Sequence, residues 1–378
     1  MTPGRLALAV LATALAATGC GGGDGVEQEV KDDLNGFLSD RTAEDAAALC
    51  RGMTPESRRL VETIAKGRHG PDAGCADAVD ERIAAGSSGG VAPTVDDADV
   101  EVDGDVARVS EPGDDEELTL RKVEGDWLVD FASAPRGIGY STRVSAACTE
   151  NTVRPQRLPL PAATRPGIAA VLEREADGFA RLRRLLEGLG PPPDRDEEHE
   201  RLVAGLRSSE ADLRRAVRGV RGVAPPLATV NRALRPIGRR TRVLLDEQRA
   251  LGIACYGLVE TRAGAGDYRR AAERICGRAL RRMTRLDRER SEGARSTDEL
   301  VRQGLRVGRE TSAALKRLDP PPGLETLHRR SADALLAAYA RLPDLARDFD
   351  RAEEKFDLVT LRAALGFARI GLFRCAQL

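Results

Sequence analysis

A two-copy repeat in the second half of the sequence constrains the fold more than any other feature. Shifting the chain by 129 residues places residues 186–199 on residues 315–328, and both stretches read Leu-x-x-Leu, one further residue, three prolines and, later, a histidine. Two more leucine pairs keep the same register, Leu206 with Leu335 and Leu213 with Leu342. A match of this length at one fixed shift indicates a duplicated unit.

Both copies are expected to be helical bundles, because their apolar residues recur at helical spacing. In the first copy the spacing predicts helices over residues 168–189, 202–220 and 227–258. In the second copy it predicts helices over residues 268–287, 298–318, 324–349 and 351–375. Residues 134–166 hold five prolines, so this stretch is expected to be mainly a connector, with a short helix around residues 144–148.

The cysteines of the repeat are placed to close each bundle. Cys148 corresponds to Cys276 to within one residue, and Cys255 corresponds to Cys375 after a short contraction. Four antiparallel helices in up-down-up-down order bring the start of the first helix and the end of the last to one pole. We therefore expect Cys276 to pair with Cys375 and, by the same reasoning, Cys148 with Cys255. The alternative is a local disulfide between Cys255 and Cys276.

The N-terminus has the pattern of an export signal. Arg5 precedes an Ala/Leu/Val-rich run over residues 6–17, which is too short for a permanent membrane span, and Cys20 follows shortly after. This end resembles the lipobox of bacterial lipoproteins, although Ala17 stands where that family prefers leucine. The resemblance implies acylation of Cys20 and leaves six cysteines, an even number that suits three disulfides outside the cytoplasm. The alternative is cleavage after Ala12-Thr13-Ala14, which would give a soluble secreted protein.

The formal charge of the chain changes sign near residue 134. Residues 21–133 carry a charge of −17 and residues 134–378 carry +15, which indicates two differently built parts. The basic part has two possible neighbours, an anionic lipid or cell-wall polymer and its own acidic partner domain. In the acidic part, helical spacing over residues 26–85 gives way to alternation over residues 98–131. This order predicts helices packed on one face of an antiparallel sheet.

Three stretches of the acidic part carry a family resemblance. They are the closing strand Trp-Leu-Val-Asp-Phe at 127–131 and the cysteine-containing stretches 49–55 and 74–76. Together with the order of elements, they resemble the NTF2-like cone fold, particularly small exported actinobacterial versions. The resemblance implies an α+β domain with a disulfide between Cys50 and Cys75, and a cavity that serves either as an enzyme pocket or as a binding site.

The sequence gives little sign of catalysis or of nucleic-acid binding. His69 in a glycine-flanked loop and the acidic run 114–117 offer no acid and base at a defined spacing. Aromatic residues make up only 3 % of the chain, which leaves few rings for stacking on bases. The apolar run 356–373 is interrupted by Arg362 and Arg369, so it is expected to be a core helix and not a membrane span.

Two histidines at equivalent places in the repeat raise the question of a metal. His199 and His328 each follow an acidic residue by three positions, Asp196 and Glu325 respectively. A Glu-x-x-His pair is a ligand motif of di-iron bundles, but that site needs two such pairs and two further carboxylates in one bundle interior. Here the pairs lie in different copies and only one contains glutamate. We therefore expect no metal, with the acids stabilising the first turn of a helix.

The sequence thus predicts an α+β NTF2-like cone domain followed by two related helical bundles. The expected boundaries are a signal peptide at 1–19, a lipidated tether at 20–25, the NTF2-like domain at 26–133, a connector at 134–166, a first bundle at 167–260 that borrows Cys148 from the connector, and a second bundle at 267–378. We expect a lipid-anchored protein on the extracytoplasmic side of a bacterial cell membrane that acts as a non-catalytic binding or interaction module without a cofactor. Its expected partners are the membrane, through the anchor, and another envelope protein or a small apolar ligand, but not nucleic acid. The alternative is a hydrolase or isomerase that uses the NTF2-like cavity.

Overall fold

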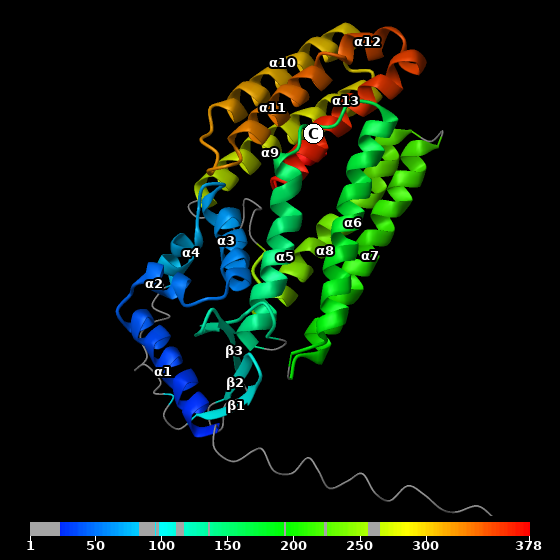
Figure 1. Cartoon of the computed structure of the whole chain (residues 1–378). Helices are drawn as coiled ribbons and strands as arrows, with labels where there is room; N and C mark the ends of the chain where they lie inside the picture. Colours follow the sequence, from blue (N-terminus) through cyan, green and yellow to red (C-terminus); the bar gives the residue numbers. More distant parts are fainter. Residues whose placement is uncertain are drawn as a thin grey trace, which may run out of the picture.

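The structure is mainly helical and contains one small antiparallel sheet (Figure 1). It is a computed structural model that describes residues 23–82, 95, 98–110, 117–134, 137–192, 194–222, 225–255 and 265–378. The expected signal peptide at 1–19 and the lipidation site at Cys20 lie outside the described residues. None of the helices within these ranges is long and apolar enough to cross a membrane.

The described residues of the acidic part of the chain contain four helices and four strands. The helices are α1 (Gly23–Thr42), α2 (Ala46–Arg51), α3 (Pro55–His69) and α4 (Cys75–Arg82), and the strands are β1 (Asp99–Asp103), β2 (Val106–Ser110), β3 (Glu117–Val123) and β4 (Asp126–Val129). Helix α1 begins inside the stretch 20–25 that was expected to be a tether. Helix α3 begins with Pro55 after Thr54, whose side chain accepts a hydrogen bond from the backbone N–H of Ser57 at 3.2 Å, as is usual for an N-cap threonine.

The sheet is a simple meander in the order β1-β2-β3-β4, with every neighbouring pair antiparallel. Val109 faces Val100 on one side and Leu118 on the other, and Leu120 faces Val129. The alternation that the sequence shows therefore does form strands. The loop before α3 extends the sheet, because Met53 makes an isolated parallel bridge to Val129.

The expectation of an NTF2-like cone is wrong. A cone needs long strands that curl around a cavity, whereas the four strands here have only four to seven residues each. The buried face of the sheet is filled instead by Trp127 and by Val30 and Leu34 of α1, which belong to one compact apolar cluster. The fold class is therefore mainly α, with a small filled sheet in place of a cone.

Residues 137–157 form a helix of 21 residues, α5 (Gly137–Arg157), where the sequence was expected to give mainly a connector. Pro155 lies in the last turn of this helix, where a missing backbone N–H and a restricted preceding residue disturb only the helix end. Helix α5 packs against α3 on one side and against α6 on the other, so it joins the acidic part to the bundles (Figure 1).

The two copies of the repeat form two packed bundles. The first copy contains α5, α6 (Arg165–Leu189), α7 (Asp196–Arg221) and α8 (Pro226–Ala250). The second contains α9 (Gly266–Ser291), α10 (Thr297–Lys316), α11 (Glu325–Tyr339), the short α12 (Leu342–Arg347), α13 (Phe349–Arg369) and a final 3-10 turn at Cys375–Gln377. Because α5 matches α9 in the repeat, the first copy begins before residue 167, where its start was expected.

Helix α13 belongs to both bundles. It packs against α11 of its own copy and against α6 and α8 of the other (Figure 1). Its Phe367, and Ile370 directly after its end, are buried in the core of the second copy. Its Leu358, Leu361 and Leu365 are buried among the residues of α6, α7 and α8. The two copies therefore share this helix, which contributes side chains to the apolar interior of each.

Candidate functional site

The six cysteines other than Cys20 form three disulfides. The pairs are Cys50 with Cys75, Cys148 with Cys255, and Cys276 with Cys375. These are the pairs that the family resemblance and the repeat predict, and the alternative bond between Cys255 and Cys276 is excluded. Each copy of the repeat is closed by a disulfide between its first helix and the segment after its last helix.

The repeated histidines bond to tyrosines and do not face one another. The hydroxyl of Tyr140 lies 3.3 Å from Nδ1 of His199, and the hydroxyl of Tyr268 lies 2.7 Å from Nδ1 of His328. Nε2 of His328 lies 2.9 Å from the carbonyl oxygen of Leu315. A carbonyl can only accept, so Nε2 carries the proton and Nδ1 accepts from the tyrosine.

Burial favours the neutral form of both histidines. Burial lowers the pKa of the His199 imidazole, with partial compensation from Asp196 and Glu200, and burial also lowers the pKa of the His328 imidazole. Burial raises the pKa of Tyr140 to about 12. The pairs are thus structural elements of each bundle. The sequence contained the signal for them, because Tyr140 stands eight residues before Cys148 and Tyr268 stands eight residues before Cys276.

Nothing else in the described part of the chain provides a reactive centre. Among those residues, no group of three or more His, Cys, Asp or Glu side chains is placed to hold a metal ion. The sequence Gly-x-Ser-x-Gly occurs once, at residues 86–90, which lie outside the described ranges. The buried Asp130 accepts hydrogen bonds from the hydroxyls of Thr54 and Ser57, at 3.3 and 3.2 Å, and from Ser133. No histidine takes part in this cluster, which joins α3 to the end of the sheet.

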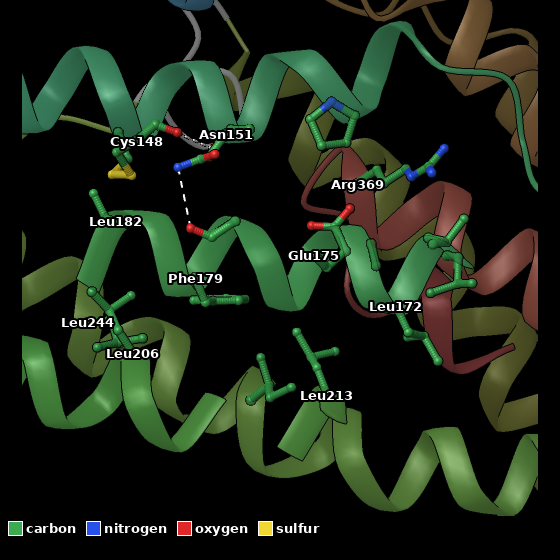
Figure 2. Close-up of a pocket in the computed structure, with 18 of the residues that line it drawn as sticks. Cys148, Asn151, Leu172, Glu175, Phe179, Leu182, Leu206, Leu213, Leu244 and Arg369 are labelled. Atoms are coloured by element: carbon green, nitrogen blue, oxygen red, sulfur yellow. Dashed lines mark hydrogen bonds between the residues drawn. A yellow bond between two sulfur atoms is a disulfide. The ribbon is translucent and has the colours of Figure 1, made fainter. Parts of the chain in front are cut away.

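The first copy of the repeat contains an apolar cavity of about 230 Å³. Its wall comes from α5, α6, α7, α8 and α13 (Figure 2), together with the Cys148–Cys255 disulfide. The apolar side chains of the wall include Leu172, Phe179, Leu182, Leu206, Leu213, Leu244 and Leu365. The cavity is larger than the ~150 Å³ that holds a benzene molecule and stays free of water when it is lined only by apolar groups.

Two charged side chains, Glu175 of α6 and Arg369 of α13, lie at the same end of this cavity (Figure 2). The side chain of Glu175 is partly accessible, but its Oε1 is shut off from solvent and has no hydrogen-bond partner in the described structure. Burial raises the pKa of the Glu175 carboxyl, and the positive charges of Arg369, Arg174 and Arg181 oppose that rise. A buried carboxyl oxygen without a partner is costly, so its presence here calls for a ligand or a role.

Arg369 is only 8 % exposed and is only partly satisfied. Its Nη1 donates to the carbonyl oxygen of Pro159 at 3.3 Å, and its backbone carbonyl accepts from the side chain of Gln156 at 2.9 Å. Its Nε and Nη2 are buried and have no partner among the described residues. Burial lowers the pKa of the guanidinium, although an arginine remains charged at any physiological pH.

The second copy has no room at the equivalent place. The shift of 129 residues puts Glu175 on Gly304 and Phe179 on Gly308. A Cβ on Gly304 would lie 2.7 Å from Leu342, and a Cβ on Gly308 would lie 2.3 Å from the ring of Tyr339. In the second copy, Tyr339 at the end of α11 and Leu342 at the start of α12 thus fill the space over the two glycines. The first copy has a glutamate and a phenylalanine at these two positions and leaves a cavity nearby.

Glu175 and Arg369 were not predicted as site residues, although the sequence contains one signal for Glu175. The buried stripe of α6 consists of apolar residues spaced alternately by four and three positions, at 168, 172, 179, 182, 186 and 189. Glu175 stands at the one position of this series that is not apolar. An acidic residue in such a stripe is unusual. Arg369 was noted only as an interruption of an apolar run.

Comparison with protein-family models, with curated proteins and with solved structures gave no match to this chain. Nothing in these comparisons points to catalysis. The cavity and the chemistry of its wall are therefore the features that bear on function.

Proposed function

We propose that this chain is a non-catalytic binding protein whose first helical bundle holds a small apolar or amphiphilic molecule. The observation that carries the proposal is the cavity of about 230 Å³ in a bundle whose second copy is closed at the same position. Concave, mostly apolar sites with a few polar groups are the usual form of small-molecule sites in proteins. The described part of the chain offers no reactive centre beside the cavity, which favours binding over chemistry.

We further propose that the protein works outside the cytoplasm, held to the membrane by acyl chains on Cys20. The three disulfides support an oxidising compartment, since such bonds are rare in the cytosol. The intact mass of protein extracted from membranes tests the anchor. We expect a chain that begins at Cys20 and carries acyl groups, whereas an unacylated chain starting elsewhere would contradict the anchor and leave the binding proposal standing.

Two substitutions on one helix test the binding site. Gly178 lies in the cavity wall, and a Cβ there would be 3.8 Å from its nearest neighbour, so Gly178→Leu adds bulk at the cavity without a backbone clash. Gly188 lies on the same helix with nothing within 4 Å of its Cβ, and Gly188→Leu is the matched control. Both changes improve helix propensity by a similar amount, up to ~1 kcal/mol. We expect the neutral apolar fluorophore phenylnaphthylamine to bind the parent protein and Gly188→Leu with the same affinity, and Gly178→Leu at least ~10-fold more weakly.

A fluorescence titration, with thermal unfolding recorded for each variant, measures these affinities. Saturable binding that is unchanged in Gly178→Leu would place the fluorophore elsewhere and contradict the proposed site. A second filling variant, Leu206→Phe on the opposite wall, gives the same test if Gly178→Leu does not fold.

A further inference from the structure

We propose that the ligand of this cavity is a single-chain amphiphile with a carboxylate head, in which Arg369 binds the head and the leucine-lined space holds the hydrocarbon tail. This inference rests on the proposed function and specifies the chemical class of its ligand. It is carried by the two unpartnered donors of Arg369, by the positive surroundings of Glu175, and by the size and lining of the cavity.

The free donors of Arg369 have the arrangement that a carboxylate prefers. Nη1 is already used by the carbonyl oxygen of Pro159, which fixes the guanidinium in the α13 end of the cavity wall. The two remaining buried nitrogens, Nε and Nη2, lie on one edge of the planar group. Two N–H groups on one guanidinium edge form a pair of parallel hydrogen bonds with the two oxygens of a carboxylate.

The charges around the head position favour an anion. Three arginines act on Glu175, namely Arg369, Arg174 and Arg181, while Glu175 is the one acid among these four groups. No hydrogen bond or ion pair joins Glu175 to Arg369 within the described structure, so Arg369 is not neutralised by direct contact. Because burial raises the pKa of Glu175, its carboxyl is more easily protonated than an exposed one, and a protonated carboxyl can donate a hydrogen bond to the head of the ligand.

The rest of the cavity suits a hydrocarbon tail. From the Glu175 end, the wall continues through Phe179 and Leu182 toward the Cys148–Cys255 disulfide (Figure 2). Leu206 and Leu244 line the opposite side. A volume of about 230 Å³ lies below the ~300 to 1,000 Å³ that is typical of sites for drug-sized ligands. A chain of medium length therefore fits better than a two-chain lipid.

Three ligands with the same tail and different heads test the assignment. Decanoate, decanol and decylammonium are titrated calorimetrically into the full chain carrying Cys20→Ala, oxidised and free of detergent. We expect decanoate to bind at least ~10-fold more tightly than decanol, and decylammonium to bind most weakly, because charge-assisted hydrogen bonds are stronger than neutral ones. In Arg369→Gln the preference for decanoate over decanol should disappear. In Glu175→Gln the preference for decanoate should persist, because the neutral amide can donate a hydrogen bond to the head in place of the protonated carboxyl.

The control for Arg369→Gln is Arg362→Gln, the same substitution on an exposed residue of the same helix. It should keep the full preference for decanoate. Equal affinities for the three ligands, or a preference that survives in Arg369→Gln, would overturn the carboxylate assignment while the cavity remained a binding site. Saturable binding of none of the three ligands, together with no binding of phenylnaphthylamine, would overturn the proposed function itself. If Arg369→Gln does not fold, the head preference of Glu175→Gln is the deciding measurement. A carboxylate site keeps its preference for decanoate in this variant. A site in which Glu175 binds a cation would instead lose affinity for decylammonium.

Discussion

Replacing both Cys276 and Cys375 with alanine should lower the free energy of unfolding by about 4 to 5 kcal/mol in the chain-entropy description of disulfides. The reason is that this bond joins residues 99 positions apart, so the reduced unfolded chain gains a large number of conformations. Both cysteines are buried in the core of the second bundle, and alanine leaves no polar group there.

The matched control is the double alanine variant of Cys50 and Cys75, whose bond joins residues 25 positions apart. The same description gives about 3 to 4 kcal/mol for this shorter loop. Urea unfolding followed by circular dichroism measures both losses. A loss below ~1 kcal/mol for the Cys276 and Cys375 variant would contradict a closed second bundle, since native disulfides usually contribute ~2 to 5 kcal/mol.

Leu361→Ala should destabilise the first bundle, although Leu361 belongs to the second copy. Leu361 is fully buried, and its neighbours in the apolar interior are residues of α6, α7 and α8, such as Leu172 and Leu213. Removing three carbons from such a site leaves a cavity and costs about 2 to 5 kcal/mol. Because the loss falls on the core of the first copy, amide hydrogen exchange of α6 and α7 should accelerate.

Leu335→Ala is the comparison variant for Leu361→Ala. Leu335 is equally buried but belongs to the core of the second copy. Its replacement should accelerate exchange in α10 and α11 first. If Leu361→Ala left the exchange of α6 and α7 unchanged, the two copies would be independent domains, and the contribution of α13 to both interiors would be contradicted.

The repeat, the bundles and the disulfide pairs of the bundles could be predicted from the sequence, because they depend on local periodicity and on one geometric rule. The start of helix α10 illustrates how local the signals are. Ser296 caps it by accepting a hydrogen bond from the backbone N–H of Glu299 at 3.3 Å. The two residues are only three positions apart in the sequence, as in a Ser-x-x-Glu capping pattern. The strands of the sheet were equally visible as alternation.

Only a short helix around residues 144–148 was predicted where the 21-residue helix α5 lies, because the prolines of residues 134–166 indicate irregular chain. Pro155 falls in the last turn of α5, so the residues before it are free to be helical. Tyr140 and Cys148 match Tyr268 and Cys276 in the repeat. Because Tyr268 and Cys276 lie in a segment with clear helical spacing, this match indicates a helix around Tyr140 and Cys148 as well.

The cone was wrongly predicted because alternation reports strands but not the curvature of the sheet. Whether a meander curls around a cavity depends on strand length and on what packs against it. Here the strands are short, and α1 supplies side chains that cover the buried face of the sheet. Neither property can be read from a period of two.

The candidate site could not be predicted from either copy alone. Glu175 comes from the first copy and Arg369 from the second, and they line the same cavity because α13 packs against the other bundle. Sequence periodicity shows which face of a helix is buried, but not which helix from a distant segment covers it. The one signal of the site in the sequence is Glu175, an acidic residue in the apolar stripe of α6.

The central claim is that the space between α6, α7 and α13 is a binding site, and amide hydrogen exchange with and without decanoate tests it most directly. If decanoate binds in this cavity, we expect its addition to slow amide hydrogen exchange in residues 171–182 of α6 and 365–369 of α13. We expect no change in residues 300–311 of α10, where the second copy is closed by Tyr339 and Leu342. Equal protection of both copies, or no protection of α6 and α13 at saturating decanoate, would contradict the claim.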